Sequence, residues 1–297
     1  MEVFEADRII GGRLATTRLG TASFDPGAQY VTARSTQFQN YLKELHETGY
    51  VSRWTPRHSN GEAGSGQILP WYVGTPGMAS MVRPLAESVR IHANRRVHTI
   101  QRVDKGWYVW FEDETSMGPF AAVAITVPAP QARLLLGGLD DLAEPLSRVR
   151  MSPCWTLMAR LDEPVFPVQD VYSDMSEVIR WIARNNTKPG RNARGETIVV
   201  HASPTWSRET EDAAPEDVAE DLWAEVSHVV GLPPVRPVQM VARLWNHGLA
   251  EQQLGESYLF STQHCVGVAG DWCLGRLAEH AFESGSSLGR AIVAALS

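Results

Sequence analysis

The chain has 297 residues, of which 43% are hydrophobic and 21% charged, a composition typical of a folded globular protein with one large or two ordinary domains. The net charge of −7 argues against nucleic acid or an anionic membrane as the main partner. No apolar run approaches the roughly 18 residues of a membrane span and no signal peptide is evident, so we predict a soluble, cytoplasmic protein. The three cysteines form no C-x-x-C pair and no zinc pattern, so we expect reduced thiols and no metal.

The start of the chain, MEVFEADRIIGGR, carries a nucleotide-binding pattern. A short apolar run stops at Glu5, as at the end of a buried strand. In a dinucleotide-binding βαβ unit, the acidic residue after the second strand bonds the adenosine ribose. Gly11 and Gly12 would let backbone N–H groups approach a pyrophosphate, and Arg13 could clamp it. The same residues also fit a solvated strand end followed by an ordinary turn.

The strand and glycine-rich turn that precede such a carboxylate by roughly 20 residues are not in this sequence. We therefore expect a nucleotide domain that is incomplete at its N-terminus and lacks the main backbone cradle for the pyrophosphate. We also expect the strand of Val3 and Phe4, and a strand over residues 265–270, each to be left without a partner.

Residues 24–34 predict a glycine-containing turn that leads into an extended segment, in which Gln29 and Tyr30 could face a cleft. A helix is predicted over 35–48, with Ser35 as its N-cap and Gly49 as its stop. Its apolar face would carry Phe38, Leu42 and Leu45. After an extended segment at 71–73, a turn over 74–77 should lead into a helix from residue 78.

Residues 89–127 alternate in a way that predicts only strands. The last of these, over 121–127, ends in a loop at Pro128-Ala129-Pro130. A strand followed by such a loop often lies beside the cofactor in nucleotide-binding sheets, but an ordinary strand exit would read the same way.

From residue 151 the pattern changes to strands over 154–161, 179–185, 197–203 and 237–245, together with a helix over 215–230. Pro215 suits the first helical position and Gly231 suits the position after the helix end. Strands with one or two covering helices predict a separate substrate-binding layer. At the C-terminal end, a strand over 265–270, a Gly-Asp turn and a helix over 276–296 make an anion site at a helix N-terminus.

We therefore expect an α/β (α+β) chain of two domains. A Rossmann-like nucleotide domain would comprise residues 1–34, 74–150 and 255–297. A substrate domain built on an antiparallel sheet would comprise residues 35–73 and 151–254.

Seven segments stand in an order and spacing that resemble one family: GGRLATTR, FDPGAQYVTAR, VGTPGMASM, SPCWTLMARLDEP, WIARNNTKPGR, HASPTWS and GVAGDWC. The chain is similar to the bacterial renalase-like FAD-dependent oxidoreductases, relatives of the flavin amine oxidases, from residue 2 to the C-terminus. The resemblance implies a two-domain fold of the hydroxybenzoate-hydroxylase type that binds FAD non-covalently. The chain departs from the family at its start, because the family opens with a strand and a G-x-G-x-x-G turn.

The resemblance also implies which residues bind FAD. Glu5 would hold the ribose, Val97 would touch the adenine through its backbone, and Trp272 is the aromatic residue that we expect near the flavin. The remaining cofactor contacts would come from Gly11, Gly12 and Arg13 at the pyrophosphate, from Gln29, Tyr30, Gly74, Thr75, Pro76, Gly77 and Met78 near the isoalloxazine, and from Gly270, Asp271 and Ala281 at the final helix.

The reaction implied by the resemblance is hydride transfer to the flavin from dihydropyridine isomers of NAD(P)H, with O₂ as the final acceptor and hydrogen peroxide as the product. The partners would be a small molecule, a dihydronicotinamide nucleotide, and molecular oxygen. Two alternatives remain open. One is an oxidase or desaturase of an amine or of a porphyrin-like or terpenoid molecule on the same fold. The other is a truncated, non-catalytic binding module that has lost FAD.

Because a flavin carries the redox chemistry itself, the protein needs only to bind, orient and exclude water, and no catalytic triad is expected. A hydride donor stacked on a flavin needs a flat apolar wall and a few polar anchors. Strand parity places Trp181, Ala183 and Asn185 on one face and Ile182 and Arg184 on the other. The candidates for substrate contact are Tyr72, Arg184, Asn185, His201 and Trp245, each of which also fits an ordinary structural role.

Overall fold

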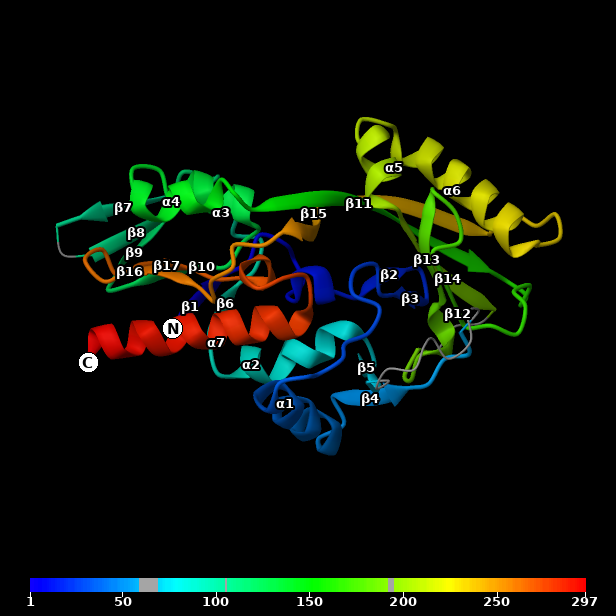
Figure 1. Cartoon of the computed structure of the whole chain (residues 1–297), viewed down its shortest axis with the longest axis horizontal. Helices are drawn as coiled ribbons and strands as arrows, with labels where there is room; N and C mark the ends of the chain where they lie inside the picture. Colours follow the sequence, from blue (N-terminus) through cyan, green and yellow to red (C-terminus); the bar gives the residue numbers. More distant parts are fainter. Residues whose placement is uncertain (59–68, 105, 192–194) are drawn as a thin grey trace. The chain divides into compact units, whose positions relative to one another are not determined.

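The computed structural model describes residues 1–58, 69–104, 106–191 and 195–297. The chain forms two compact units (Figure 1). Unit 1 comprises Met1–Ile10, Leu85–Met151 and Leu249–Ser297, and unit 2 comprises Gly11–Pro84 and Ser152–Gly248. The contacts thus group residues 11–34 and 74–84 with unit 2, whereas the expected domains counted them with the nucleotide-binding part. No helix among the described residues is long and apolar enough to cross a membrane.

A five-stranded sheet forms the centre of unit 2, in the order β12-β13-β14-β11-β15. The strands β12, β13, β14 and β11 pair antiparallel in that order, which provides the antiparallel layer expected after residue 151. Their bounds are β11 Arg150–Leu161, β12 Val171–Ser173, β13 Ile179–Arg184, β14 Glu196–Ala202 and β15 Gln239–Gln252.

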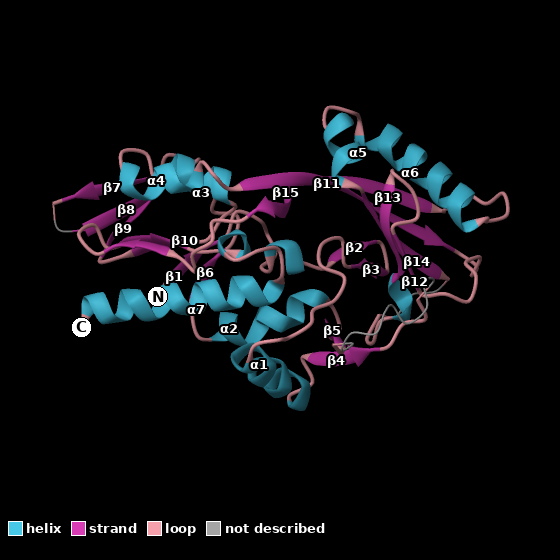
Figure 2. Ribbon diagram, viewed as in Figure 1, coloured by secondary structure: helices cyan, strands magenta, loops and turns pink. Residues whose placement is uncertain are grey.

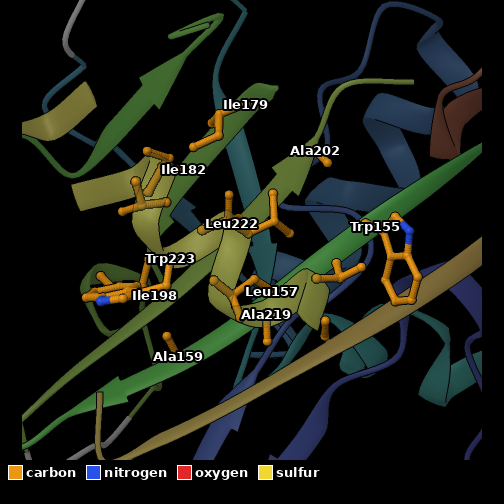
Figure 3. Close-up of a cluster of buried hydrophobic side chains, with 14 of the residues drawn as sticks. Trp155, Leu157, Ala159, Ile179, Ile182, Ile198, Ala202, Ala219, Leu222 and Trp223 are labelled. Atoms are coloured by element: carbon orange, nitrogen blue, oxygen red, sulfur yellow. The ribbon is translucent and has the colours of Figure 1, made fainter. Parts of the chain in front are cut away.

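One face of this sheet is covered by α6, Pro215–Val230 (Figure 3). The predicted helix ends are confirmed, since Pro215 stands at the N-terminus and Gly231 adopts a left-handed φ of 72° at the C-cap. Leu222 is fully buried against the sheet beside Ile182. Burial of each such side chain contributes about 1.5–3 kcal/mol relative to exposure, so this cluster anchors the layer. A short helix, α5 (Pro204–Glu209), precedes α6.

The opposite face of the sheet receives β3, Ala22–Phe24, which pairs with β2, Thr17–Leu19. Phe24 is fully buried against Met158 and Val199 of the sheet. This packing brings the chain that follows β3 onto the sheet face that α6 does not cover. The candidate site of unit 2 is built there.

The remaining elements of unit 2 are α1 and the pair β4–β5, Val51–Trp54 and Trp71–Gly74. The predicted helix is confirmed as α1, Thr36–Glu47, with the Ser35 side chain accepting a hydrogen bond from the Phe38 N–H. Its predicted apolar face is buried. The helix expected from residue 78 is shorter than predicted, because the chain forms a 3-10 turn, Met78–Val82, and then only α2, Arg83–Glu87.

Unit 1 holds several small sheets. The parallel pair β1–β6 joins Glu2–Phe4 to Arg90–His92, and the meander β7-β8-β9 joins Val97–Val103, Gly106–Phe111 and Ser116–Phe120. The third sheet has the order β10-β17-β16, with bounds Val123–Ile125, Val266–Val268 and Leu259–Ser261. The expectation that β1 and β17 lack partners is wrong, because β1 pairs with β6 and β17 is paired on both sides.

Figure 2 shows the helices of unit 1, which are α3 (Ala129–Leu135), α4 (Asp140–Leu146) and α7 (Ala278–Leu296). The loop expected at Pro128-Ala129-Pro130 is instead the start of α3, because proline is compatible with the first turn of a helix, where its missing N–H costs nothing. The strand before it covers only Val123–Ile125. Leu136 and Leu142 of the α3–α4 segment pack with Val268 and Trp272 in one core.

Candidate functional site

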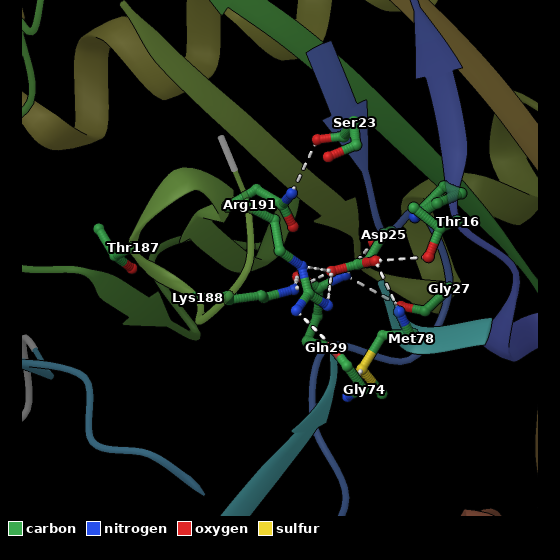
Figure 4. A network of polar contacts seen from close by, with 12 residues as sticks. Thr16, Ser23, Asp25, Gly27, Gln29, Gly74, Met78, Thr187, Lys188 and Arg191 are labelled. Atoms are coloured by element: carbon green, nitrogen blue, oxygen red, sulfur yellow. Dashed lines mark hydrogen bonds and ion pairs between the residues drawn. The ribbon is translucent and has the colours of Figure 1, made fainter. Parts of the chain in front are cut away.

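Asp25 is the centre of a polar network inside unit 2 (Figure 4). Its side chain is fully buried, and one carboxylate oxygen, Oδ1, accepts hydrogen bonds from Thr16 Oγ1 at 2.9 Å and from the Met78 N–H at 3.2 Å. The other oxygen, Oδ2, accepts from Lys188 Nζ at 3.2 Å and from Arg191 Nη2 at 2.7 Å. Burial alone would raise the pKa of Asp25, but the two cations outweigh it and hold that pKa below its ordinary value.

Lys188 lies in the same network with a fully buried side chain. Its ammonium donates to Gln29 Oε1 at 3.0 Å and stands 5.5 Å from the centre of the Trp54 ring. Burial and the nearby Arg191 charge lower the pKa of Lys188 to about 8, although the Asp25 carboxylate acts in the opposite direction. With one carboxylate facing two cations, the network of Asp25, Lys188 and Arg191 carries a net positive charge near neutral pH.

Arg191 ties this network to the turn after β5. Its Nη1 donates to the Gly74 carbonyl at 2.5 Å and to the Pro189 carbonyl at 2.7 Å. A Cβ added to Gly74 would stand 2.4 Å from the Gly77 carbonyl oxygen, so glycine is needed for this close turn. The predicted cofactor segment 74–78 is thus held rigidly by Arg191 and, through Met78, by Asp25.

The Pro26 carbonyl is a second meeting point on the same sheet face. It accepts hydrogen bonds from Thr156 Oγ1 at 3.0 Å and from Trp245 Nε1 at 3.3 Å, and His201 Nε2 lies 3.0 Å away. Since a carbonyl can only accept, His201 must carry its proton on Nε2. The Gln29 amide nitrogen, 3.4 Å from the same His201 atom, donates instead to the carbonyls of Asp25 and Gly27.

Burial is the main cause that lowers the pKa of His201 to about 4, assisted by the charges of Lys188 and Arg180 and opposed by the hydrogen bond to Pro26. His201 is therefore neutral at pH 7. A group with so low a pKa is a weak base, so this histidine is suited to positioning rather than to proton abstraction.

Aromatic rings gather beside this network. Tyr30 and Trp71 stack face to face, with ring centres 3.7 Å apart and planes 5° from parallel. Trp181 lies 5.7 Å from Tyr30 and 5.9 Å from Trp71, and Trp54 lies 5.8 Å from Trp71. We call Tyr30, Trp54, Trp71 and Trp181 the aromatic cluster. Because Lys188 stands over Trp54, the cluster adjoins the charged network.

The structure thus brings together Gln29, Tyr30, His201, Trp245 and the 74–78 turn among the residues predicted in unit 2. The Tyr72 ring contacts His46, with the two ring centres 6.4 Å apart. Arg184 is taken up by ion pairs with Glu196 at 2.5 Å and Asp170 at 3.3 Å. Asn185 is fully buried and donates to the Ser23 carbonyl at 3.0 Å.

Gly11, Gly12 and Arg13 form a turn at the start of unit 2. Gly11 has φ 117° and Gly12 has φ 52°, conformations that favour glycine. Nothing lies within 4 Å of a Cβ built on Gly12, so the backbone there is open to a ligand. Arg13 Nη1 donates to the Gly248 carbonyl at 3.1 Å.

The other predicted cofactor residues belong to unit 1. Glu5 follows β1 and accepts a hydrogen bond from the Asp7 N–H at 3.0 Å, and Val97 begins β7.

The Gly270 N–H donates to Ser284 Oγ at 3.0 Å, while Asp271 is buried. Trp272 is 1% exposed and donates to the Val127 carbonyl, so its ring serves the core of unit 1. Ala281 lies exposed in α7.

Unit 1 also has a cavity of about 330 Å³ beside β7 and the turn between α3 and α4. Its lining includes Ile100, Trp107, Leu135 and Leu139. None of the predicted site residues lines it.

Sequence reasoning missed the charged network, because its members Asp25, Lys188 and Arg191 are far apart in the chain. The only available signal was a lysine and an arginine bracketing a Pro-Gly turn in TKPGR, after a buried strand. It also missed Trp71 as the stacking partner of Tyr30 and Trp54 as a neighbour of Trp71.

Comparison with known proteins gives a family match. A family model described as flavin containing amine oxidoreductase matches residues 51–286. The match agrees with the FAD cofactor expected from the sequence, since the members of this family contain flavin.

Several solved structures share the fold. A structure assigned as a protoporphyrinogen oxidase from Exiguobacterium sp. 255-15 aligns with a TM-score of 0.70 at 10% identity, covering 98% of this chain and 92% of that chain. Cyclohexylamine oxidase from Brevibacterium oxydans IH-35A aligns with 0.69 at 12% identity, covering 99% and 93%. A putrescine oxidase redesigned in its cofactor binding aligns with 0.67 at 12% identity, covering 99% and 93%. At these identities the likeness concerns the fold alone, and it confirms the predicted mixed α/β class.

The residues present fit a flavin nucleotide. The open glycine turn at Gly11-Gly12 offers backbone N–H groups, and Arg13 beside it offers a guanidinium, which is the donor set that a pyrophosphate needs.

Proposed function

The chain belongs to the flavin containing amine oxidoreductase family, and from that premise we propose that it is an FAD-dependent oxidase of dihydropyridine isomers of NAD(P)H. Glu5, Gly11, Gly12 and Arg13 would hold the adenosine and pyrophosphate parts of the cofactor. When bound, FAD supplies the hydride acceptor and the path of the electrons to O₂, which leaves as hydrogen peroxide.

The observation that carries the proposal is the position of Lys188 against Trp54. The aromatic cluster offers apolar ring faces of the kind that a planar ring stacks on, with Tyr30 and Trp71 nearly parallel and Trp181 tilted by 42° against Trp71. The charged network behind it carries two cations for one carboxylate. A protonated amine would be repelled there, while a neutral dihydropyridine ring with a negatively charged remainder would be attracted.

The protein's own part in such a reaction is positioning. Tyr30, Trp71 and Trp181 would hold the donor ring flat, and the rigid 74–78 turn would fix the cofactor side of the site. Hydride transfer from a dihydropyridine needs no general base. This requirement agrees with the low pKa of His201.

The test is reduction of the flavin without oxygen. The FAD-loaded protein is mixed anaerobically with isomeric dihydro-NAD(P), with ordinary NAD(P)H, and with cyclohexylamine and putrescine in parallel. We expect the isomeric donors to bleach the flavin within seconds, and air to restore its colour with release of peroxide. Trp71→Ala should slow the bleaching, because it removes the ring that stacks on Tyr30.

The same experiment decides between the alternatives. Bleaching by an amine, with none by a dihydropyridine, would replace the proposal with an amine oxidase. Failure with both would favour an oxidase or desaturase of a porphyrin-like or terpenoid molecule. A purified protein that is colourless and cannot be loaded with FAD would instead be a binding module.

A further inference from the structure

An extra residue in β13 lies next to the aromatic cluster. In the pairing with β14, Ile179 stands opposite Ala202 and Trp181 opposite His201, so Arg180 has no opposite residue. This irregularity is a β-bulge, which re-aims side chains and is frequent beside active sites. Ile179 faces the α6 core, whereas Trp181 faces Tyr30 on the other side.

The positive charge of Arg180 affects the pKa values of three residues near Trp181. Burial raises the pKa of Tyr30 and raises that of Cys154 to about 11, and in both cases the Arg180 charge opposes the effect. The same charge helps to keep His201 neutral. Tyr30, Cys154 and His201 come from three separate segments of unit 2, and the Arg180 charge acts on all three, so Arg180 lies near the site.

The Arg180 side chain makes no hydrogen bond and no ion pair with any residue in the described part of the chain. The neighbouring arginines differ: Arg184 is bound to Glu196 and Asp170, and Arg191 to Asp25. Arg180 is also half-buried. A cation withdrawn from water without a counter-charge is costly, and a bound anion would remove that cost.

We propose that Arg180 is the anion-recognising residue of the unit 2 site, and that the ligand of this site is a planar molecule carrying a carboxylate or phosphate. The guanidinium fork binds either group through two parallel N–H···O bonds. The bulge sets Arg180 beside Trp181, so one ligand can stack on the aromatic cluster and reach the fork. The inference rests on the proposed function for the identity of the ring, but the anion requirement comes from Arg180 itself.

Equilibrium binding tests the proposal without turnover. Calorimetric titration of the FAD-loaded protein would compare nicotinate with nicotinamide, which differ by a carboxylate, and nicotinamide mononucleotide with nicotinamide riboside, which differ by a phosphate. The proposal expects the wild type to prefer the anionic member of at least one pair by about 10- to 100-fold. The pair that shows the preference tells whether carboxylate or phosphate is the natural group.

Arg180→Gln should abolish the preference while leaving the neutral ligand's affinity and the FAD affinity unchanged. Arg180→Lys keeps the positive charge but loses the two parallel donors of the guanidinium. This variant should retain part of the preference for the anionic ligand. Lys43→Gln on exposed α1 is the matched control for loss of one positive charge in the same unit. An equal melting temperature for all four proteins would show that each is folded.

No preference in the wild type, or a preference that survives Arg180→Gln, overturns the proposal. So does a loss of FAD affinity in Arg180→Gln, because Arg180 would then serve the cofactor. If the anaerobic test finds no reduction by dihydropyridines but the Arg180-dependent preference is present, the proposed function fails and the anion site stands.

Discussion

The ammonium of Lys188 and the carboxylate of Asp25 lie 3.2 Å apart, with both side chains completely shielded from water. Arg191 approaches the same carboxylate oxygen at 2.7 Å. A buried ion pair contributes little net stability, because desolvation offsets the attraction. Its consequence lies elsewhere: removal of Asp25 would leave the buried charges of Lys188 and Arg191 without a counter-charge.

Replacement of Asp25 is the first test. Asp25→Asn would leave Lys188 and Arg191 as two buried cations without a counter-charge, and we expect the free energy of unfolding to fall by about 3–5 kcal/mol. Urea unfolding measures it. Asp162→Asn is the control, because Asp162 pairs with Arg160 at an exposed site, where about 1 kcal/mol or less is expected. Equal effects of the two changes would show that the network is not closed to solvent.

Lys188 should make the stability of the folded protein depend on pH in the alkaline range. Its pKa is about 8 in the folded chain against an ordinary value of 10.5, so between these values the unfolded chain binds more protons. Stability attributable to Lys188 therefore rises as the pH increases from about 8 to 10.5, by an amount on the order of 3 kcal/mol. In Lys188→Met this rise should be missing. Parallel stability curves for the two proteins would contradict the low pKa.

His201 should make the stability of the folded protein depend on pH in the acidic range. Its pKa is about 4 in the folded chain against an ordinary 6.5, so below pH 6.5 the unfolded chain takes up a proton that the folded chain refuses. Stability attributable to His201 is therefore lost as the pH falls from about 6.5 to 4. His201→Gln, which can still donate to the Pro26 carbonyl, should flatten this part of the curve in urea titrations. A curve as steep as that of the wild type would mean that His201 takes up a proton as readily in the folded state.

Cofactor affinity tests the predicted nucleotide contacts. Glu5→Ala and Arg13→Ala should each weaken FAD about 10- to 100-fold, since each removes one partner of a charged hydrogen bond. Titration of the apoprotein with FAD measures this change. Arg18→Ala, at an exposed position on β2, should leave the affinity unchanged. Unaltered binding in both test variants would remove these residues from the cofactor site.

The local elements could be predicted where the sequence carries its own start and stop signals. Ser35 and Gly49 delimit α1, and Pro215 and Gly231 delimit α6, because capping depends on neighbours within a few residues. The helix α3 was missed because its first residues, Ala129 and Pro130, read as a loop. A proline near the start of a helix and one in a turn give the same local pattern.

The site could be predicted only in part. Gln29, His201 and Trp245 were candidates because of their chemical type and strand position. The ion network was out of reach, since Asp25 meets Lys188 and Arg191 across 163 and 166 residues of chain. The bulge at Arg180 was equally hidden, because strand alternation fixes faces only when no residue is inserted.

The stack of Tyr30 on Trp71, with Trp54 and Trp181 close by, also has a spectroscopic consequence. Aromatic rings held this close and in fixed orientation couple their electronic transitions, and the resulting near-ultraviolet circular dichroism disappears when tertiary packing is lost. The near-ultraviolet circular dichroism of these rings therefore reports whether unit 2 is folded. The signal can be read in the apoprotein of each variant named above that keeps both stacked rings, which excludes only Trp71→Ala. A planar molecule that separates the two rings would change the signal.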